Sequence, residues 1–594
     1  MTKIYAGLFL LFATVSAKSQ NPFLLKDIYP GATGSGIQEI VKTSGFTFFN
    51  ALDGSSADRG LYRTDGTTAG TIKLNLTYPT YISTKADKLT ALGNKVVFAG
   101  DNFSRYGEIW SSDGTQAGTI ALERYQPTIS TTRPVISDVI KLNNEVIYSV
   151  RNTDNHLLLK KTNGTVGSLE VVHDFGTYPT GNAQVTLFNI INNFLYFIVY
   201  DGADNDQLWR SDGTAGGTFM LYDFGPSQYV AGGLMPAGSN FYVMIVTPGI
   251  GNVLWKSDGT VAGTAALKTI GTTGNNNYPS NTAIGNTLYF AGLDGNGKEL
   301  WKTDGTGGGT VLVADINSGA GSSNPSNFTV LNNNLYFAAS DGTGNKLWKY
   351  DGTAATLVKD INPSGQTSVQ SSFVVSNNNI ILSANTAVGG TELWITDGTT
   401  ANTMQVADIN PGTANSSPAF LTPGNPIYFS ANNGVNGAEI FKYNNNGDVI
   451  QANRSFYVND NSTTGDVFTL AVGNNANNGS KAFPFATPDY AYSIAQAGDT
   501  IYVDAGSYDL GGLTYSFPKP ITFRGANYTV SPNDPANKLL PNGGRNSETV
   551  ITNGQINIAS NDLSFEGFTL DLGGNRAGFV LQNSAGTNND FGNF

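Results

Sequence analysis

Short apolar runs separated by polar turns recur along residues 22–450. Residues 326–361 show the pattern, because SNFTVL, LYFAAS, KLWKY and TLVKDI are connected in turn by NNN, DGTGN and DGTAA. Val, Leu, Tyr, Phe and Trp favour pleated, half-buried strands, whereas Asn and Gly tolerate the positive φ that tight hairpins require. Each such segment therefore predicts four short antiparallel strands.

The second run of each segment is apolar at almost every position. LYFAA at 335–339 and LYFAG at 288–292 are two examples. A strand with one face in water would alternate between apolar and polar residues, so we expect these strands to be buried on both faces.

One phrase, L-W-x-x-D-G-T-x-x-G-T, recurs nine times at steps of 46 to 50 residues. Two copies are worn, LKKTNGTVGS at 159–168 and IFKYNNNG at 440–447, and all six tryptophans occupy the aromatic slot of the phrase. Four-stranded units of about 40–50 residues are typical of β-propeller blades. The nine occupants of the slot are Tyr62, Trp110, Lys160, Trp209, Trp255, Trp301, Trp348, Trp394 and Phe441.

The two ends of the repeat region predict a closed ring. PFLLKDIYPG at 22–31 matches the fourth strand and exit loop of a unit, such as TLVKDINPSG at 356–365, while the ninth unit has a weak fourth strand of its own. We expect residues 24–28 to complete the last blade, because this would remove an open sheet edge. That reading gives nine blades. Eight blades with one aberrant unit is the alternative, since propellers usually have four to eight.

The phrase resembles the repeat arrays of secreted bacterial surface proteins, some of them labelled hyalin-like. The resemblance covers about 22–450 and implies an extracellular role without a defined reaction. The D-G-T turn is also similar to the Asp-box hairpin of sialidase-type propellers, in which Asp and Gly stabilise a turn and take no part in catalysis.

After an Asn-rich stretch at 445–455 the pattern changes. Residues 456–508 resemble the opening of a right-handed parallel β-helix of the pectate-lyase-like superfamily. The matching pieces are GNNANNG (473–479), FPFAT (483–487), a short helix at 488–497 and AGDTIYVDAGSY (497–508). The helix would cap the apolar end of the solenoid. Further strands are expected at 521–525, 549–554, 556–560, 563–572 and 578–582, so residues 456–594 would hold the cap and about three coils of an incomplete β-helix.

Residues 1–19 have the pattern of a secretory signal peptide. Lys3 precedes an apolar run at 4–15, and the small residues Ala17 and Ser19 follow it. The run is shorter than the ~20 residues that span a bilayer. We therefore expect a secreted or cell-surface protein with no membrane span after cleavage.

Composition excludes several classes of function. The net charge of −12, without a cluster of Lys or Arg, argues against binding to nucleic acid or to an anionic membrane. The absence of cysteine excludes disulfides and thiolate sites. His156 and His173 are the two histidines, so a three-His zinc centre cannot form. We expect both to lie in surface loops.

The β-helix resemblance implies a sheet carrying carboxylates, calcium and a basic residue in the enzymes of that superfamily. The corresponding candidates are Asp504, Lys519, Arg524, Asp562 and Asp571. Glycoside hydrolysis needs two carboxyl groups about 5–10 Å apart, and sequence spacing does not establish such a pair. Asp504 lies within AGDTIYVDAGSY (497–508), a segment that recurs at the entry coil of such β-helices, which favours a structural role. No catalytic residue is assigned.

The sequence motifs are also too weak to identify a metal site or a ligand site. DGADNDQ brings Asp201, Asp204 and Asp206 together, but no distal Glu completes a calcium loop. The D-G-T aspartates are explained as turn formers that bond their own backbone. The tryptophans are explained by core packing. We therefore assign no metal ligand, no cofactor and no ligand-binding residue, and calcium stays open.

Two functions fit these features. The first is a non-enzymatic binding or adhesion protein whose propeller is a platform for an extracellular glycan or a surface protein. The second is a polysaccharide lyase or glycoside hydrolase whose β-helix active site would lie mostly beyond residue 594. We expect no catalysis within residues 1–594.

Overall fold

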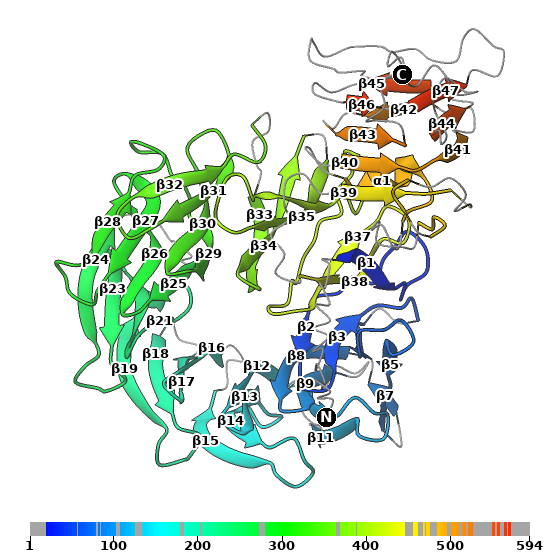
Figure 1. The fold of residues 1–594 in the computed structure, drawn as a ribbon. Coiled ribbons are helices and arrows are strands. Elements are labelled where there is room, and N and C mark those ends of the chain that lie inside the picture. The colour runs from blue at the N-terminus through cyan, green and yellow to red at the C-terminus, as the bar shows by residue number, and fades with distance from the viewer. Residues whose placement is uncertain are drawn as a thin grey trace, which may run out of the picture.

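The computed structural model describes residues 20–571 except for 56–57, 79–80, 84, 102–106, 125–133, 179–182, 202–204, 272–279, 364–368, 388, 411, 446–454, 461, 463–466, 470, 476–483, 496–499, 510–513, 518–520, 527–548, 553–554, 559–563 and 567. Within this part of the chain, nine antiparallel sheets follow one another around a central axis (Figure 1). In its described residues the protein is an all-β, nine-bladed propeller with almost no helix. The signal-peptide prediction at 1–19 lies outside the described residues.

The first three blades run from Ile40 to Thr177. Blade 1 contains β2 (Ile40–Lys42), β3 (Thr47–Ala51), β4 (Gly60–Thr64) and β5 (Ile72–Leu74), and it is followed by the hairpin of β6 (Leu76–Tyr78) and β7 (Tyr81–Ser83). Blade 2 contains β8 (Lys85–Leu92), β9 (Lys95–Asp101), β10 (Gly107–Ser112) and β11 (Ile120–Arg124). Blade 3 contains β12 (Val135–Leu142), β13 (Glu145–Arg151), β14 (His156–Thr162) and β15 (Glu170–Thr177).

Blades 4 to 6 repeat the arrangement. Blade 4 contains β16 (Gln184–Ile191), β17 (Phe194–Tyr200), β18 (Asn205–Ser211) and β19 (Phe219–Pro226). In blade 5, β20 (Tyr229–Val230) and β21 (Met235–Ala237) both pair with β22 (Asn240–Thr247), and β23 (Gly251–Ser257) and β24 (Ala265–Gly271) follow. Blade 6 contains β25 (Asn281–Ile284), β26 (Thr287–Asp294), β27 (Gly297–Thr303) and β28 (Val311–Ala314).

Blades 7 to 9 complete the ring. Blade 7 contains β29 (Ser326–Leu331), β30 (Asn334–Ser340), β31 (Asn345–Tyr350) and β32 (Ala355–Lys359), which confirms the four strands predicted at 326–361. Blade 8 contains β33 (Val369–Ser376), β34 (Asn379–Thr386), β35 (Gly390–Thr396) and β36 (Met404–Ala407). Blade 9 contains β37 (Ile427–Asn432), β38 (Ala438–Asn444) and β1 (Gln20–Lys26), and Ala419 adds a single bridge to Ser430 at the inner edge.

The two ends of the propeller meet in blade 9, as predicted. Strand β1 pairs antiparallel with β38, and Leu24 lies opposite Phe441. The strand lies earlier than the expected 24–28, because the Ile28 N–H donates to the buried carboxylate of Glu439 at 3.0 Å instead of to a neighbouring strand. The nine-blade prediction is confirmed, and the alternative of eight blades is wrong.

Apolar side chains from adjacent blades form the core. Phe290 of β26 and Phe337 of β30 are fully buried, as expected for second strands covered on both faces. One cluster joins blades 7 and 8 by packing Leu347 against Ile380 and Leu382. The stability of each blade therefore depends on its neighbours.

The aromatic slot packs against the fourth strand of the preceding blade. Trp209 lies 5.1 Å from Phe175 and 5.2 Å from His173 between ring centroids, both on β15. The expectation that the histidines lie in loops is wrong, because His173 belongs to β15 and His156 begins β14. His156 Nδ1 lies 2.9 Å from a carboxylate oxygen of Asp174.

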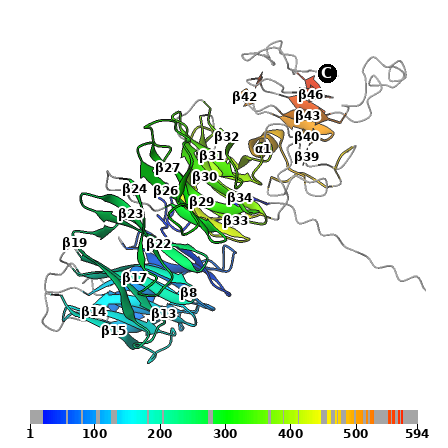
Figure 2. The same cartoon turned by 90° about the vertical axis from the view of Figure 1, so that its left-hand side faces the viewer.

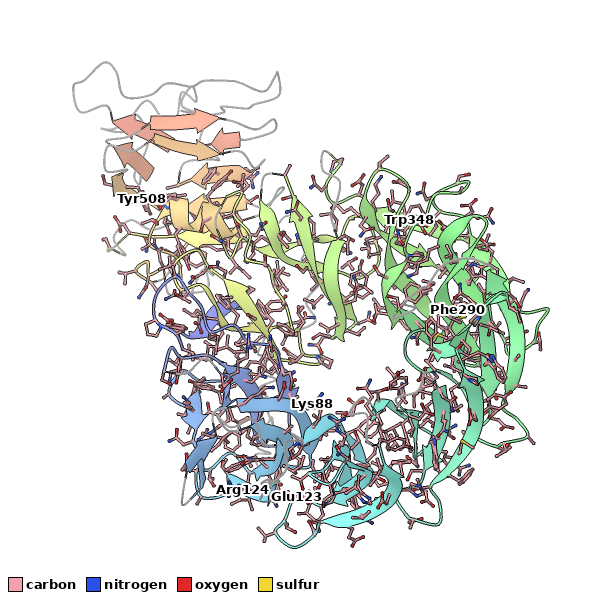
Figure 3. All side chains as sticks on the ribbon, turned by 180° about the vertical axis from the view of Figure 1, so that it is seen from behind. Lys88, Glu123, Arg124, Phe290, Trp348 and Tyr508 are labelled. Atoms are coloured by element: carbon pink, nitrogen blue, oxygen red, sulfur yellow. The ribbon has the colours of Figure 1, made fainter. Side chains whose placement is uncertain are left out.

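The third copy of the repeat replaces the slot aromatic with Lys160, and the structure supplies a partner. Lys160 is 8% exposed and forms an ion pair with Glu123 on β11, the fourth strand of the preceding blade. The Tyr148 hydroxyl donates to the same carboxylate. A charged contact thus replaces the aromatic contact between these two blades. Figure 3 places Glu123 and its neighbour Arg124 on the outer side of the ring.

The D-G-T turns are held by their own side chains. In blade 6, Asp304 Oδ1 accepts hydrogen bonds from the Thr306 backbone N–H at 2.9 Å and from its hydroxyl at 2.8 Å. The Thr306 Oγ1 in turn accepts from the Gly309 N–H at 2.9 Å. These bonds confirm that the repeated aspartates form turns.

Beyond the ring, the described strands pair in parallel. One sheet contains β39 (Ser455–Val458), β40 (Thr500–Val503), β43 (Thr522–Gly525) and β46 (Ser564–Glu566). A second contains β41 (Gly506–Asp509), β44 (Thr549–Thr552) and β47 (Phe568–Asp571), and a third contains β42 (Thr514–Phe517) and β45 (Gln555–Ile558). The strand expected at 578–582 lies outside the described residues.

The described chain contains one α-helix, α1 (Pro488–Ile494). It lies beside β39 and β40 (Figure 2) and ends earlier than the predicted 488–497. Within the residues that the structure describes, no helix is long and apolar enough to cross a membrane.

Candidate functional site

Asp504 is fully buried, and its hydrogen bonds indicate a structural role. Its carboxylate accepts hydrogen bonds from the backbone N–H groups of Val467 (2.5 Å), Phe468 (2.9 Å) and Thr469 (2.6 Å). The Thr469 hydroxyl adds a fourth bond at 2.8 Å. Because this carboxylate accepts three consecutive backbone N–H groups, it holds the loop at 467–469 in place.

The remaining β-helix candidates do not converge in the described residues. Arg524 on β43 donates to the Tyr502 hydroxyl at 3.2 Å and covers the Tyr502 ring. Asp571 ends β47, which belongs to a different sheet. Lys519 and Asp562 lie outside the described residues.

Of the three aspartates considered for calcium, the structure describes Asp201 and Asp206, which lie close enough to interact electrostatically. Asp206 on β18 accepts a hydrogen bond from the Val230 N–H at 2.7 Å, and Asp201 follows β17. Asp204 lies outside the described residues. Across the described chain, no group of three or more His, Asp or Glu is arranged to hold a metal ion.

A recess on the inner face of the propeller is the strongest candidate for a site. It holds about 440 Å³, within the ~300–1,000 Å³ typical of small-ligand sites. We call it the inner recess. Its walls come from blades 9, 1, 2 and 3, and they consist of Gln38, Glu39, Ile40, Val41, Lys88, Leu89, Thr90, Asp138, Val139, Phe420 and Leu421.

A β-bulge in the first strand of blade 2 forms one wall. The pairing of β8 with β9 shifts between Asp87 and Thr90, so Lys88 and Leu89 together oppose one residue. Lys88 has a φ of 55°, which is uncommon for a residue with a side chain. Bulges redirect side chains out of the regular alternation of a strand. Figure 3 places Lys88 on the inner side of the ring.

Glu39, just before β2 of blade 1, accepts hydrogen bonds from the backbone N–H groups that the bulge leaves outside the sheet ladder. Its carboxylate accepts hydrogen bonds from the Lys88 N–H at 3.0 Å and from the Leu89 N–H at 2.7 Å. Buried N–H groups outside a sheet ladder need such an acceptor. Asp138 in the bulge of β12 faces the next blade in the same way, and the Phe188 N–H donates to it at 3.5 Å. The acidic side chains thus link neighbouring blades.

Burial and neighbouring charges set the ionisation of this wall. Burial raises the pKa of Glu39, opposed by the two N–H donors of the bulge. Burial also raises the pKa of Asp138, and the positive charge of Lys88 opposes this shift. Burial alone would raise the pKa of Asp87, but its ion pair with Lys85 at 2.9 Å helps to hold that pKa below its usual value.

Phe420 gives the inner recess an exposed aromatic side chain. It is 44% exposed and has a φ of 56°. It lies between Ala419, which bridges Ser430, and Thr422, whose N–H donates to the Tyr428 carbonyl at 3.0 Å. An aromatic ring beside hydrogen-bonding groups is suited to a ligand with both apolar and hydroxylated surfaces.

None of the residues of this recess is predicted as a site by the sequence patterns. Gln38 and Glu39 precede β2, and Phe420 and Leu421 precede β37, whereas the others lie on the first strands β2, β8 and β12. All of them fall outside the repeated phrase. The one available signal is an acidic residue close to the start of a first strand, such as Glu39 or Asp138, and that signal is too weak to identify alone.

No protein-family model matches this chain, and no curated protein matches its sequence. Among solved structures, the chain is similar to a prolyl endopeptidase at 14% identity and a TM-score of 0.33, over 53% of this chain and 45% of that chain. A puromycin hydrolase matches at 12% identity and a TM-score of 0.32, over 60% of this chain and 58% of that chain. The chain thus spans about half the length of these hydrolases.

A third match is the β-propeller domain of the Trilobed protease from Pyrococcus furiosus, at 10% identity and a TM-score of 0.31. It covers 56% of this chain and 96% of that domain. BamB from Moraxella catarrhalis matches at 16% identity and a TM-score of 0.27, over 52% of this chain and 80% of that chain. Likeness at this level carries no argument about activity.

Proposed function

We propose that this chain is a secreted or cell-surface binding protein without catalytic activity, and that the inner recess binds an extracellular glycan. One observation carries the proposal. Phe420 is exposed in a recess of about 440 Å³ that also contains the side chains of Lys88, Asp138 and Gln38. An aromatic face combined with a few polar groups is the usual composition of a small-ligand site.

Binding fits the hydrogen bonds of the recess better than catalysis does. Both oxygens of Glu39 already accept backbone N–H groups. A general acid or base must instead reach a proton of the substrate. Glu39 therefore supports the shape of the recess, and Asp138 also bonds the backbone of the next blade. Lys88 and the exposed ring of Phe420 are available to a ligand, and the Asp138 carboxylate can accept a further hydrogen bond beside them.

The proposal extends to the ends of the chain. The apolar run at 4–15 supports export. The parallel pairing of β39, β40, β43 and β46, with α1 beside two of these strands, supports an assignment of this region as the capped beginning of a right-handed β-helix. In this proposal the β-helix is a second domain joined to the propeller that carries the glycan site.

Glycan-array binding by the chain from residue 20 to 594 tests the proposed function. We expect binding that falls at least about tenfold in the Phe420→Ala variant, because the stacking face is lost. Phe219→Ala is the matched control, since Phe219 is 38% exposed on the outer strand β19. Equal binding by the Phe420→Ala variant would contradict the proposed site. Release of unsaturated or reducing sugar from acidic polysaccharides would favour the lyase or hydrolase instead.

A further inference from the structure

We infer that the inner recess selects neutral saccharides and rejects uronic acids. This inference rests on the proposed function and names the ligand class of the same site. It follows from the charges of the described residues that line the recess, where the carboxyl groups of Glu39 and Asp138 stand against one ammonium group, that of Lys88.

The neighbouring cations are already engaged. Lys85 forms its ion pair with Asp87 at 2.9 Å. Lys42, next to the lining residue Val41, donates to the carbonyl oxygens of Pro423 (2.7 Å) and Pro426. Neither lysine is among the residues that line the recess. Among the residues that the structure describes, a uronate entering the recess would therefore meet Lys88 alone as a lining cation.

Lys88 is itself surrounded by negative charge. It interacts electrostatically with both Asp87 and Asp138. At ion-pair distance, however, no described carboxylate holds its ammonium group. The group can donate to a neutral hydroxyl without losing a direct partner. A carboxylate bound there would lie close to Asp138, and like charges brought together oppose binding.

A neutral sugar ring matches the remaining groups. Its hydroxyl groups can donate to Asp138 and accept from Lys88, while its C–H face covers the Phe420 ring. The exposed side chain of Gln38 offers a further amide donor and acceptor. Each feature of the recess thus has a counterpart on an uncharged saccharide.

Titration of the chain from residue 20 to 594 with matched tetrasaccharides tests the inference. The neutral probes are galactotetraose, cellotetraose and mannotetraose, and the charged probes are tetragalacturonate and tetramannuronate. We expect the tightest neutral probe to bind about tenfold or more tightly than either uronate at low salt, and we expect added salt to narrow that gap.

The Asp138→Asn variant isolates the charge. The amide oxygen can still accept the Phe188 N–H, so the fold is retained, and we expect the preference for neutral probes to fall at least about threefold. Asp154→Asn is the control, because it removes the same charge from an exposed position in the β13–β14 hairpin. Thermal melts of both variants verify folding.

The outcomes separate the two claims. Uronates that bind as tightly as the neutral probes, or an Asp138→Asn variant with an unchanged preference, would overturn the inference and leave the proposed glycan site standing. Failure of every neutral and charged probe to bind, together with an empty glycan array, would overturn the proposed function and the inference with it.

Discussion

At the residue scale, the second glycine of the repeated phrase has a steric reason. A Cβ atom built on Gly309 would lie 2.1 Å from Asp304 Oδ1. Asp304 cannot move aside freely, because its carboxylate holds two hydrogen bonds to Thr306. The same overlap occurs at Gly70, Gly118, Gly217 and Gly263. The glycine therefore makes room for the aspartate that closes the turn.

This contact predicts a difference between two adjacent glycines. We expect Gly309→Ala to lower the free energy of unfolding by about 1–3 kcal/mol, because the methyl group must displace the Asp304 carboxylate. Gly308→Ala is the matched control, since nothing lies within 4 Å of the Cβ position there. Urea titration of both variants measures the effect. Equal midpoints for the two variants would refute this account of the turn.

The turn also shows where sequence reasoning stops at this scale. The roles of Asp and Gly follow from their known turn chemistry, and the structure agrees. A second hydrogen bond of the turn does not follow from the phrase. Thr303, just before Asp304, shares a 2.7 Å hydrogen bond with the Thr310 hydroxyl. The phrase L-W-x-x-D-G-T-x-x-G-T gives the position of Thr303 as x, although Ser or Thr occupies it in seven of the nine copies.

At the scale of elements, a buried glutamate fixes the end of each fourth strand that it contacts. Glu392 of β35 accepts hydrogen bonds from the Ile409 N–H at 2.9 Å and the Ser416 N–H at 3.0 Å. Glu299 of β27, two blades earlier, accepts hydrogen bonds from the Ile316 N–H and the Ser323 N–H in the same way. The chain therefore leaves the sheet before the D-I dipeptide, although the apolar pattern alone extends the strand through it.

Glu392, together with Glu439 of β38, predicts a pH dependence of stability. Burial raises the pKa of Glu392 and of Glu439 to about 7, from the usual 4.5. Between these values the folded state binds a proton that the unfolded state has lost. Their contribution to stability is therefore complete below pH 4.5 and is lost as the pH rises to about 7. We expect the urea midpoint to fall across this range, and we expect a shallower fall for Glu392→Gln.

The control for this prediction is Glu170→Gln, which removes a carboxylate whose side chain is 66% exposed on β15.

Carboxylates with a lowered pKa change the free energy of unfolding over a lower pH range than Glu392 does. The hydrogen bond from Lys346 holds the pKa of Asp341 at about 2, so the stability that Asp341 contributes is lost only in stronger acid. A slope between pH 4.5 and 7 that is identical in the wild-type chain and in Glu392→Gln would contradict the assignment.

At the scale of the whole molecule, the number of blades and the closure were predictable and the inner recess was not. The blade count follows from the spacing of one aromatic slot, a local pattern that repeats. The recess depends on Lys88 and Phe420, which are far apart in sequence and meet only when the ring closes. Lys88 lies in the bulge of β8 and Phe420 in the segment before β37, and neither belongs to the repeated phrase, so periodicity alone cannot place them.

Closure also joins the blades through hydrogen bonds that the sequence does not reveal. Lys442 of blade 9 donates to the Gly66 carbonyl of blade 1 at 3.1 Å, and Lys26 of β1 donates to the Thr71 carbonyl at 2.6 Å. Arg210 makes the corresponding bond to Gly259 of the next blade at 2.8 Å. The junction between the chain ends thus has the same contacts as an ordinary junction between consecutive blades.

The closing strand predicts a strong contrast between two positions of β1. Leu25 is 1% exposed and packs with Phe49 and Ile440 between blades 1 and 9, whereas Phe23 on the same strand is 39% exposed. We expect Leu25→Asp to open blade 9, because a carboxylate without a partner is costly to bury. Hydrogen exchange of β37, β38 and β3 should then accelerate at least about tenfold.

Phe23→Asp is the matched control, and we expect its exchange rates to stay close to those of the wild-type chain.

A synthetic peptide of residues 20–29 tests whether the opened sheet edge of β38 causes the faster exchange. Added in excess to the Leu25→Asp variant, the peptide can replace the defective strand beside β38 and restore slow exchange, since the register between Leu24 and Phe441 is set by main-chain pairing. If Leu25→Asp leaves the exchange of β38 unchanged, the ring does not depend on its first strand. If exchange accelerates equally in all nine blades, the blades unfold as one unit, and closure contributes to the stability of the whole propeller instead of to its last blade alone.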